Sequence, residues 1–555
     1  MLSTLALATL SSNRVSAATV LVDSAIRYQT MDGFGSSERV FDDPHVFDNF
    51  NPATGRAATV MTTAQQEAVL DRLYTDLKLT RVRPANPDNG SGMEAVNDNN
   101  DPNVTDLSKF NFSWKNLDAH VDYITRARER GANNFFLSPL GREPWMGTTT
   151  ANDAAEYSEW LFAQVKRSAD RGVRLPFLSV ANEPSYSRNT MSGQFIRDVI
   201  KNLGPRLRAD GFETQFVTPD DVRSSDGASK AAIILADPIA RQYVGALATH
   251  LYDESVHNVA QMKALADQYG LPLWMTEFTA GAMGTAGLPQ NAFSWGSLMH
   301  DLISNYDVSA VDYLWGSFGE WEGNATTLIS LNNTGAAYDG YTLNKTYYTT
   351  GQFSRFIEPG AERIKAESSD AGVQTTAYLS DSELVLVAIN TDSASKEITF
   401  DLSGIPAEQF ARIRTSLIEN WATLPSIAVS GSTLTATLPG NSIETFVASI
   451  PAIVAGDFSE NWVINAADLA LWRTGFGTNG EASHMQGDAD GDRDVDGADF
   501  LVWQRDLGDG VSIVATNAAV PEPTAMALLA IGSLALLCRS MARPCPKMVF
   551  DRERA

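Results

Sequence analysis

The chain contains very little cysteine and histidine for its length. Two of its 555 residues are cysteines, Cys538 and Cys545, and both lie close to the C-terminus. The body of the chain therefore has no disulfide framework, no thiol nucleophile and no cysteine-based zinc site. The six histidines form no HExxH motif, which argues against a zinc protease. No GxGxxG motif follows an early apolar stretch, which argues against a dinucleotide-binding fold.

Basic residues are also scarce. Lys and Arg number 42 against 67 Asp and Glu, which gives a formal net charge of −25. Nucleic-acid binding requires basic patches, so the charge argues against a nucleic-acid partner. The same charge suits an exported protein that acts on a neutral or weakly charged polymer, and it suits calcium sites. The length predicts two to four domains, and the hydrophobic content of 44% supplies a large core.

Short apolar stretches alternate with amphipathic helical stretches from residue 31 to residue 354. This alternation is typical of a parallel sheet in which each strand is followed by a helix. Eight such stretches predict an α/β fold of the (β/α)8 TIM-barrel type. The predicted strands are residues 32–36, 79–84, 133–139, 175–183, 213–219, 245–252, 271–277 and 310–317.

The pattern changes after the predicted barrel. Within residues 355–450, apolar and polar residues alternate in segments such as TTAYLS and ELVLVAIN, with Gly, Asp and Ser between them. Such alternation is typical of antiparallel strands with one face in a core. Residues 19–30 alternate similarly. We therefore expect residues 19–30 and 355–450 to form a side antiparallel β-sandwich.

Two glutamates follow apolar strands of the predicted barrel. Glu183 ends LPFLSVANE and Glu277 ends LPLWMTE. TIM barrels carry their chemistry at the C-terminal ends of the strands, so both side chains are expected there. Cleavage of a glycosidic bond requires such a pair: one acid protonates the leaving oxygen, and one carboxylate attacks the sugar or activates water. The alternative is that each glutamate is an ordinary solvated residue at a strand end.

Four motifs resemble glycoside hydrolase family 30, a family of retaining β-glycosidases: DGFGSS, SVANEPS, WMTEF and YYTTGQFSRFIEPGAERI. The resemblance covers residues 19–450 and includes the side β-sandwich. It implies a double-displacement mechanism in which Glu183 is the general acid/base and Glu277 is the nucleophile. Retention of configuration requires the two carboxyl groups to lie about 5–5.5 Å apart. This chemistry requires no cofactor.

The resemblance also assigns polar residues around the two glutamates to substrate binding. Asn182 is expected to hydrogen-bond the sugar 2-hydroxyl. Arg83 is expected to keep Glu277 ionised. Arg81 alternates with Arg83 on the same predicted strand, and a salt bridge that anchors a loop is an almost equally good interpretation of it.

Four more residues complete the expected binding site. His250 and Tyr252, in THLYD, resemble the His-x-Tyr motif of related barrels, with Tyr252 donating a hydrogen bond to the nucleophile. A buried structural role is the alternative for His250. Trp145 and Trp315 are expected to stack on sugar rings, because aromatic faces pack against the C–H faces of sugars. Trp321 extends this platform or anchors a surface loop.

One region departs from the pattern of glucuronoxylan-cleaving members, which grip a glucuronic acid branch with polar and basic residues. The corresponding stretch here, GSFGEWEGNATTLISLN, contains Glu320 and Glu322 and no Arg. The predicted activity is an endo-β-glycanase of the xylanase or glucuronoxylanase type acting on a polysaccharide such as xylan. The alternatives are a β-1,6-glucanase, a β-1,6-galactanase, a glucosylceramidase-like β-glucosidase, and a non-catalytic carbohydrate-binding module.

Residues 456–510 contain a duplication, in which Gly456 and Gly487 begin two similar segments. The second copy, DADGDRDVDGAD, has carboxylates at loop positions 1, 3, 5, 7, 9 and 12, which is the ligand spacing of an EF-hand calcium loop. The duplication resembles a type I dockerin, a small α-helical module that binds Ca²⁺, and implies a cohesin-like partner. The alternative is a solvated acidic loop. The predicted ligands are Asp488, Asp490, Asp492, Asp494, Asp496 and Asp499 in the second copy and, with weaker affinity, Asp457, Ser459, Asn461, Asn465 and Asp468 in the first.

Both ends of the chain predict export. Residues 1–18 combine an apolar stretch with small residues at a cleavage point, as a signal peptide does. Residues 520–545 combine Pro-Glu-Pro, an apolar run and basic residues. They resemble a PEP-CTERM sorting signal, which implies transient contact with a membrane sorting machinery; a plain membrane anchor is the alternative. The expected location is the periplasm, the cell surface or the exterior of a bacterium.

Overall fold

The computed structural model describes residues 17–508, with gaps at 42–45, 47–49, 52–55, 58–60, 87–91, 114–116, 147–150, 187–189 and 335–336. The predicted signal peptide up to residue 16 and the predicted sorting signal at 520–545 lie outside the described residues. Within the described ranges, no helix combines the length and the apolar character needed to cross a bilayer.

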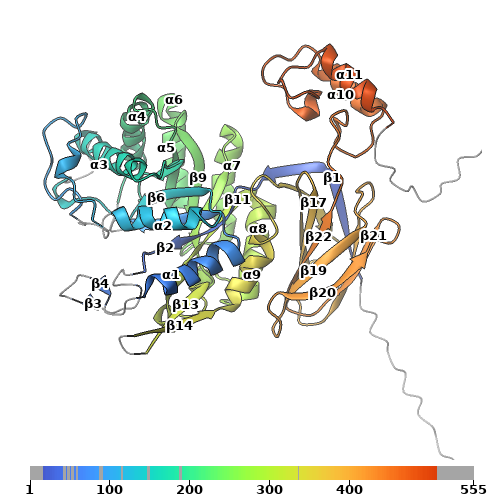
Figure 1. Ribbon diagram of the computed structural model, residues 1–555, viewed down its shortest axis with the longest axis horizontal. Helices are drawn as coiled ribbons and strands as arrows, with labels where there is room; N and C mark the ends of the chain where they lie inside the picture. Colours follow the sequence, from blue (N-terminus) through green and yellow to red (C-terminus); the bar gives the residue numbers. More distant parts are fainter. Residues whose placement is uncertain are drawn as a thin grey trace, which may run out of the picture. The chain divides into compact units, whose positions relative to one another are not determined.

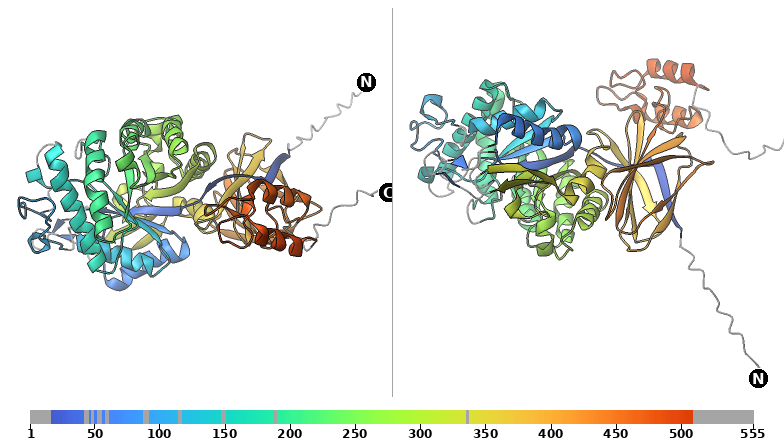
Figure 2. Two further views of the ribbon diagram at one scale, coloured as in Figure 1. Left: turned by 90° about the horizontal axis from the view of Figure 1, so that it is seen from above. Right: turned by 60° about the horizontal axis from the view of Figure 1, so that its bottom comes forward.

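Eight parallel strands close into a barrel in the order β10-β11-β2-β5-β6-β7-β8-β9 (Figures 1 and 2). All eight predicted strands are present, which confirms the TIM-like barrel. Most strand boundaries differ from the predicted ones by a few residues, and one difference bears on the site: β7 ends at Ser179, so Glu183 lies beyond the strand rather than on it. The strands are β2 (Gly33–Glu38), β5 (Arg81–Asn86), β6 (Asn134–Pro139), β7 (Phe177–Ser179), β8 (Gln215–Asp221), β9 (Val244–His250), β10 (Leu273–Phe278) and β11 (Val308–Leu314).

Helices surround the barrel and begin at side chains suited to cap them. Thr62 and Gln65 form a capping box at the start of α1, and Asn291 accepts two backbone N–H bonds at the start of α8. The helices are α1 (Thr63–Leu70), α2 (Ala119–Arg128), α3 (Ala151–Asp170), α4 (Gly193–Ala209), α5 (Ser224–Ala236), α6 (Pro238–Arg241), α7 (Val259–Tyr269), α8 (Ala292–Tyr306) and α9 (Lys345–Ser354), with a π-helical turn at Asp71–Asp76. Short 3₁₀ turns lie at Leu107–Lys109, Pro144–Met146, Val256–Asn258, Ala280–Ala286, Glu320–Glu322 and His484–Gln486.

The chain after the barrel forms a nine-stranded sheet that includes the N-terminal strand β1 (Ala18–Thr30) (Figure 2). The prediction that residues 19–30 join this sheet agrees with the pairing of β1 to β15. The sheet is not wholly antiparallel as predicted, because β1 also pairs in parallel with β18. The other strands are β15 (Glu362–Ser368), β16 (Val373–Leu379), β17 (Glu383–Asn390), β18 (Lys396–Asp401), β19 (Gln409–Thr415), β20 (Ala422–Ala428), β21 (Thr433–Leu438) and β22 (Ser442–Ser449).

This sheet has its own hydrophobic core, separate from the core under the barrel helices. Phe400, Phe410 and Phe446 are fully buried in it, and alternate residues of β21 point inward. Trp462, from the first copy of the duplication, is also buried in this core, and its indole nitrogen donates to the carbonyl of Pro451 at 2.9 Å.

Two small sheets decorate the barrel. The stretch after β11, expected to be a loop, contains β12 (Ser317–Gly319), β13 (Ile329–Thr334) and β14 (Ala337–Leu343) in one sheet. A two-residue pair, β3 (Phe50–Asn51) and β4 (Arg56–Ala57), lies in the segment after β2. The duplication forms two helices, α10 (Ala466–Gly475) and α11 (Gly497–Asp506).

Candidate active site

The two predicted catalytic glutamates meet at the C-terminal end of the barrel. Glu277 lies on β10, and Glu183 lies in the turn after β7, where its backbone φ of 48° is left-handed. One oxygen of each glutamate and one ring nitrogen of His250 all lie within 4.8 Å of one another. Both glutamate side chains are mostly buried, with 14% of Glu183 and 11% of Glu277 exposed. A left-handed backbone at a non-glycine residue is uncommon and is often found at functional sites.

Arg83 on β5 hydrogen-bonds five side chains of the site. This arginine is almost fully buried and donates from Nη1 to Glu277 Oε2 at 2.8 Å and to Ser37 Oγ at 3.0 Å. Its Nη2 donates to Ser138 Oγ, to Asn182 Oδ1 and to Asp220 Oδ2. Burial alone would lower the pKa of Arg83, but the charges of Asp220 and Glu277 outweigh it and raise the pKa above its ordinary value.

His250, at the end of β9, joins two carboxylates. Its Nδ1 lies 3.0 Å from Glu183 Oε1 and its Nε2 lies 3.3 Å from Asp220 Oδ1. Burial opposes the charged ring, but the charge of Glu277 and the hydrogen bonds to Asp220 and Glu183 outweigh it and raise the pKa of His250 to about 10. The imidazole is therefore a cation at neutral pH, with both nitrogens donating.

Tyr252 and Asn182 also lie at the positions expected of them. The hydroxyl of Tyr252 donates to Glu277 Oε1 at 3.0 Å. Burial and then the charge of Glu277 raise the pKa of Tyr252 well above its ordinary value, so the hydroxyl keeps its proton. Asn182 precedes Glu183, is buried, and accepts a hydrogen bond from Arg83. Glu277 thus receives one donor on each oxygen, which fixes the orientation of its carboxylate.

The predicted aromatic residues are held by the loops around the site. Trp315 stacks on Phe318, with ring centroids 4.9 Å apart, and its backbone nitrogen donates to Thr326. Trp145 donates from its indole nitrogen to the carbonyl of Glu94 at 2.6 Å. Trp321 is 49% exposed, and its indole nitrogen donates to the carbonyl of Val46. All three rings are fixed by their partners, and Trp321 has the features of both of its alternatives.

Sequence reasoning missed Asp220, the most connected carboxylate of the site. Asp220 is fully buried at the end of β8, follows a cis proline, and accepts from Arg83, His250, Ser138 and Thr276. Burial raises its pKa, but the charges of Arg83 and His250 outweigh this and hold the pKa far below its ordinary value. The signal was available, because Asp220 directly follows the predicted strand ETQFVTP, as Glu277 ends its own strand.

Glu38 was also missed, at the end of β2. It is fully buried and accepts from Ser36 Oγ at 2.6 Å and from the backbone nitrogen of Ser317 at 3.3 Å. Burial raises the pKa of Glu38 to about 8, so this carboxyl is protonated at neutral pH. A Cβ on Gly316 would lie 1.7 Å from Glu38 Oε1, so only glycine fits beside this group.

The second copy of the duplication brings its predicted calcium ligands together in two groups of three. Ligand oxygens of Asp488, Asp490 and Asp492 lie within 4.8 Å of one another, and those of Asp494, Asp496 and Asp499 do so as well. The buried Oδ1 of Asp494 has no hydrogen-bond partner within the described residues, which fits a site that a cation completes.

Some of the predicted ligands accept hydrogen bonds from backbone N–H groups in this structure. In the first copy, Asp457 and Asp468 accept backbone N–H bonds from Asn461 and Ser459. Asn465 caps α10 through the backbone nitrogen of Ala467, as Asp496 caps α11.

Known proteins resemble both the sheet and the barrel. A family description, the glycosyl hydrolase family 30 beta sandwich domain, matches residues 360–446. Glucuronoxylanase XynC of Bacillus subtilis is 27% identical over 299 residues, which cover 53% of the chain and 66% of the xylanase, just under two thirds of its length. An endo-1,6-beta-D-glucanase of Neurospora crassa is 26% identical over 411 residues, which cover 68% of the chain and 79% of the glucanase.

A solved structure extends the likeness to the whole two-part fold. The GH30 endoxylanase from Clostridium papyrosolvens C71 superposes with a TM-score of 0.58 at 25% identity and covers 78% of the chain and 100% of the endoxylanase. The matched sheet, the barrel and these relatives together support the assignment of the chain to glycoside hydrolase family 30.

Proposed function

We propose that the chain is a retaining glycoside hydrolase that cleaves β-linked polysaccharide by double displacement. One observation carries the proposal: a carboxylate oxygen of Glu183 and one of Glu277 lie within 4.8 Å of each other at the C-terminal end of the barrel. Retaining glycosidases hold their carboxyl groups about 5–5.5 Å apart, whereas inverting enzymes leave room for a water between them.

In the first step, Glu277 attacks the anomeric carbon of the bound sugar. Arg83 and Tyr252 orient its carboxylate, so the attacking oxygen is positioned before substrate arrives. Glu183 gives its proton to the leaving oxygen, and a glycosyl ester on Glu277 results. In the second step, Glu183 takes a proton from water, which attacks the ester and releases the sugar with its configuration retained.

His250 and Asp220 support Glu183 in both steps. The imidazolium donates to Glu183 and is itself held by the buried Asp220. This arrangement fixes the carboxyl of Glu183 at a constant distance from Glu277 and keeps a positive charge beside the acid/base. Asn182 is positioned to contact the sugar 2-hydroxyl, and Trp315 and Trp145 to pack against sugar rings.

Xylan is the favoured substrate, with β-1,6-glucan, β-1,6-galactan and β-glucosides as alternatives. The similarity to a glucuronoxylanase and to an endoxylanase favours xylan, while the similarity to an endo-1,6-beta-D-glucanase favours the first alternative. The segment from Trp315 to Asn344 contains no Lys or Arg, so it offers no cation for a glucuronate branch. We therefore expect cleavage that does not depend on such branches.

The decisive experiment compares the wild type with Glu277→Gln on a panel of xylan, glucuronoxylan, β-1,6-glucan, β-1,6-galactan and an aryl β-glucoside. We expect the wild type to release products of retained configuration, measured by proton NMR of the anomeric signals. Glu277→Gln keeps the shape of the site and loses at least about 10³-fold in rate. If both proteins bind the glycans equally and neither cleaves them, the chain is a non-catalytic binding module.

For residues 456–508 we propose a calcium-binding, dockerin-like module that docks to a cohesin-like partner. Its second loop would hold Ca²⁺ through Asp488, Asp490, Asp492, Asp494, Asp496 and Asp499. Several of its large apolar side chains are exposed, Phe476 by 58% and Leu501 by 63%, as expected of a docking surface. Calcium titration of the chelated full chain tests the site, and Asp490→Ala should abolish the tighter binding event while leaving the hydrolysis rate unchanged.

We further propose that the enzyme is exported and acts outside the inner membrane of a bacterium, guided by residues 1–18 and 520–545. The size of the proposed substrate supports this location, because a polysaccharide does not cross a membrane intact. Mass spectrometry of the exported protein tests it: the mature chain should begin near Ala18 and lack the segment after the Pro-Glu-Pro motif.

A further inference from the structure

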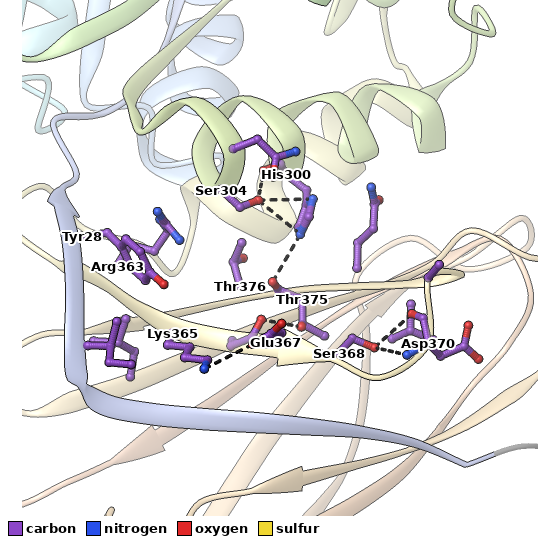
Figure 3. A pocket seen from close by; sticks show the side chains of 17 residues that line it. Tyr28, His300, Ser304, Arg363, Lys365, Glu367, Ser368, Asp370, Thr375 and Thr376 are labelled. Atoms are coloured by element: carbon purple, nitrogen blue, oxygen red, sulfur yellow. Dashed lines mark hydrogen bonds and ion pairs between the residues drawn. The ribbon is translucent and has the colours of Figure 1, made fainter. Parts of the chain in front are cut away.

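A polar cleft of about 550 Å³ lies between the barrel and the nine-stranded sheet (Figure 3). Helix α8 forms one wall, strands β15 and β16 form the floor, and β1 closes one end. Such a volume lies within the range of small-molecule sites. The residues that matter here are Tyr28 on β1, His300, Ser304 and Asn305 on α8, and Arg363, Gln374 and Thr375 on the floor.

The cleft exists because two neighbouring strands separate. β15 and β16 pair at Glu362–Leu379, Arg363–Tyr378 and Ile364–Ala377, and their pairing stops there although both strands continue for several residues. Beyond Ile364 the carbonyl of Ala366 accepts from the side chain of Thr375, and the carbonyl of Thr375 faces His300 Nε2 at 3.3 Å. Beyond Ile364 the backbone pairing of the two strands is therefore replaced by side-chain contacts between the strands and with α8.

An exposed aromatic ring stands at the β1 end of this cleft. Tyr28 is 43% exposed, and Ile26, two residues earlier on the same strand, is 40% exposed. The guanidinium of Arg363 lies 3.7 Å from the centroid of the Tyr28 ring. Arg363 is in turn held by Gln29 and by Asp307 at 2.8 and 2.7 Å. The guanidinium thus covers one face of the ring, and the ring keeps part of its apolar surface exposed at the cleft.

The charges around the cleft are paired within the protein. Lys365 lies 3.2 Å from Glu367, and Asp370 lies 2.7 Å from Lys396. Most of the neutral groups are also hydrogen-bonded within the protein: Ser304 donates to the carbonyl of His300, and Gln374 accepts from Ser297 and donates to Asp301. The buried hydroxyl of Thr376, which lines the cleft, has no hydrogen-bond partner among the described residues. An aromatic face beside neutral hydrogen-bonding groups is the chemistry that recognises a saccharide, whose rings have C–H faces and hydroxyl edges.

The cleft and the catalytic residues lie at opposite ends of the barrel strands. His300, Ser304 and Asn305 lie in the last turns of α8, just before β11 begins at Val308. The catalytic carboxylates lie at the opposite, C-terminal ends of the strands. A sugar bound in the cleft is therefore separate from the sugar that is cleaved.

We propose that this cleft is a second saccharide-binding site, which holds the enzyme on its polysaccharide while the barrel cleaves it. The proposal rests on the proposed glycosidase function for the identity of the polymer. It predicts that the cleft contributes to binding and cleavage of an insoluble polymer and contributes nothing to cleavage of a short soluble chain.

The test uses the full chain with Tyr28→Ala and, on the opposite wall, Asn305→Ala. Leu21→Ala is the matched control, because Leu21 is also 43% exposed on β1 and does not line the cleft. Each variant is also made in the Glu277→Gln background, and its binding to insoluble xylan and to insoluble β-1,6-glucan is measured by depletion from solution. Loss of one aromatic contact should weaken binding by about 3- to 10-fold. Cleavage of the insoluble polymer should fall in parallel, with the rate on a short xylo-oligosaccharide unchanged.

The outcomes separate this proposal from the proposed function. If Tyr28→Ala and Asn305→Ala bind and cleave the insoluble polymer as Leu21→Ala does, the second site is refuted while the glycosidase stands. If the wild type cleaves neither polymer but binds one of them through Tyr28, the second site stands and the glycosidase proposal fails. Absence of both binding and cleavage overturns both. A circular dichroism melt of each variant confirms that the sheet is intact.

Discussion

Two buried arginines on β5 lie two residues apart and have different surroundings. Arg81 forms a closed pair with Asp312, with Nε–Oδ1 and Nη2–Oδ2 distances of 2.9 and 3.0 Å, and stacks over Trp274. Arg83 instead divides its donors among several acceptors, among them the partly exposed Glu277. An arginine that gives its donors to one buried carboxylate holds the barrel together, whereas an arginine shared among several acceptors leaves a carboxylate free to react. Because side chains alternate along a strand, Arg81 and Arg83 point to the same face, and both are buried at different heights in the barrel.

Breaking the closed pair of Arg81 and Asp312 should have the largest effect, and that effect should be on stability. Arg81→Met leaves Asp312 buried without its cation and should lower the free energy of unfolding by about 3–5 kcal/mol. Activity per folded molecule should remain close to that of the wild type. Urea unfolding with a parallel assay of the folded fraction measures both.

The double variant Arg81→Met/Asp312→Leu is the control for this prediction. Removing both charges eliminates the uncompensated carboxylate, so most of the lost stability should return. A double variant that is less stable than Arg81→Met would show that the pair contributes through its packing on Trp274 rather than through charge balance.

Substitution of Arg83, the shared cation, should instead affect kcat more than stability. Arg83→Lys keeps the charge but offers a single ammonium in place of a planar fork, so it cannot serve Glu277, Asp220 and Ser138 together. We expect kcat to fall by about 10²-fold or more, since the nucleophile loses its fixed orientation. Arg81→Lys serves as the matched control and should change stability more than kcat. Equal losses of kcat in the two lysine variants would contradict the distinction between the two arginines.

Substitution of Asp220 tests whether its charge keeps His250, the cation beside Glu183, protonated. His250 has a folded pKa of about 10, above its value in an unfolded chain, so its contribution to stability is complete below pH 6.5 and is lost as the pH rises to about 10. Asp220→Asn removes one of the two anions that hydrogen-bond the ring. The imidazole should then titrate at lower pH, so the loss of stability should still begin near pH 6.5 and should end at a lower pH than in the wild type.

NMR titration of the His250 ring and urea unfolding from pH 6 to pH 10 measure this shift. His250→Gln is the control and should abolish the stability change that His250 causes in this window. If the ring of Asp220→Asn titrates as in the wild type, the charge of Asp220 is not what holds the proton on His250.

The sequence was sufficient for the barrel because eight apolar stretches alternate with amphipathic helical stretches, which is typical of a parallel sheet. It was also sufficient to place Arg83, Tyr252 and Asn182 beside the glutamates, through their resemblance to a family. The short length of β7 was not predictable, since the apolar run continues through Val180 and Ala181 into a turn whose left-handed residue is a glutamate.

Long-range pairing could not be predicted from local patterns. The parallel pairing of β1 with β18 joins residues near 20 to residues near 400, and local alternation carries no information about such partners. The burial of Trp462 in the core of the sheet is another case, because the duplication alone suggested an independent module. The equivalent position in the second copy is Arg493, which shares its left-handed backbone.

Glu38 is a buried carboxyl group that differs from the carboxylates paired with Arg81 and Arg83. Its hydrogen bonds come from the neutral donors Ser36 and Ser317. Its folded pKa of about 8 lies above the ordinary value of 4.5, so the folded state binds the proton more tightly and stability falls as the pH rises from about 4.5 to about 8. Glu38→Gln has no proton to lose. It should match the wild type within about 1 kcal/mol at pH 4.5 and become the more stable protein as the pH approaches 8. Urea unfolding of both proteins across this range measures the gap, and a difference that stays constant with pH would mean that Glu38 is already ionised in the folded protein.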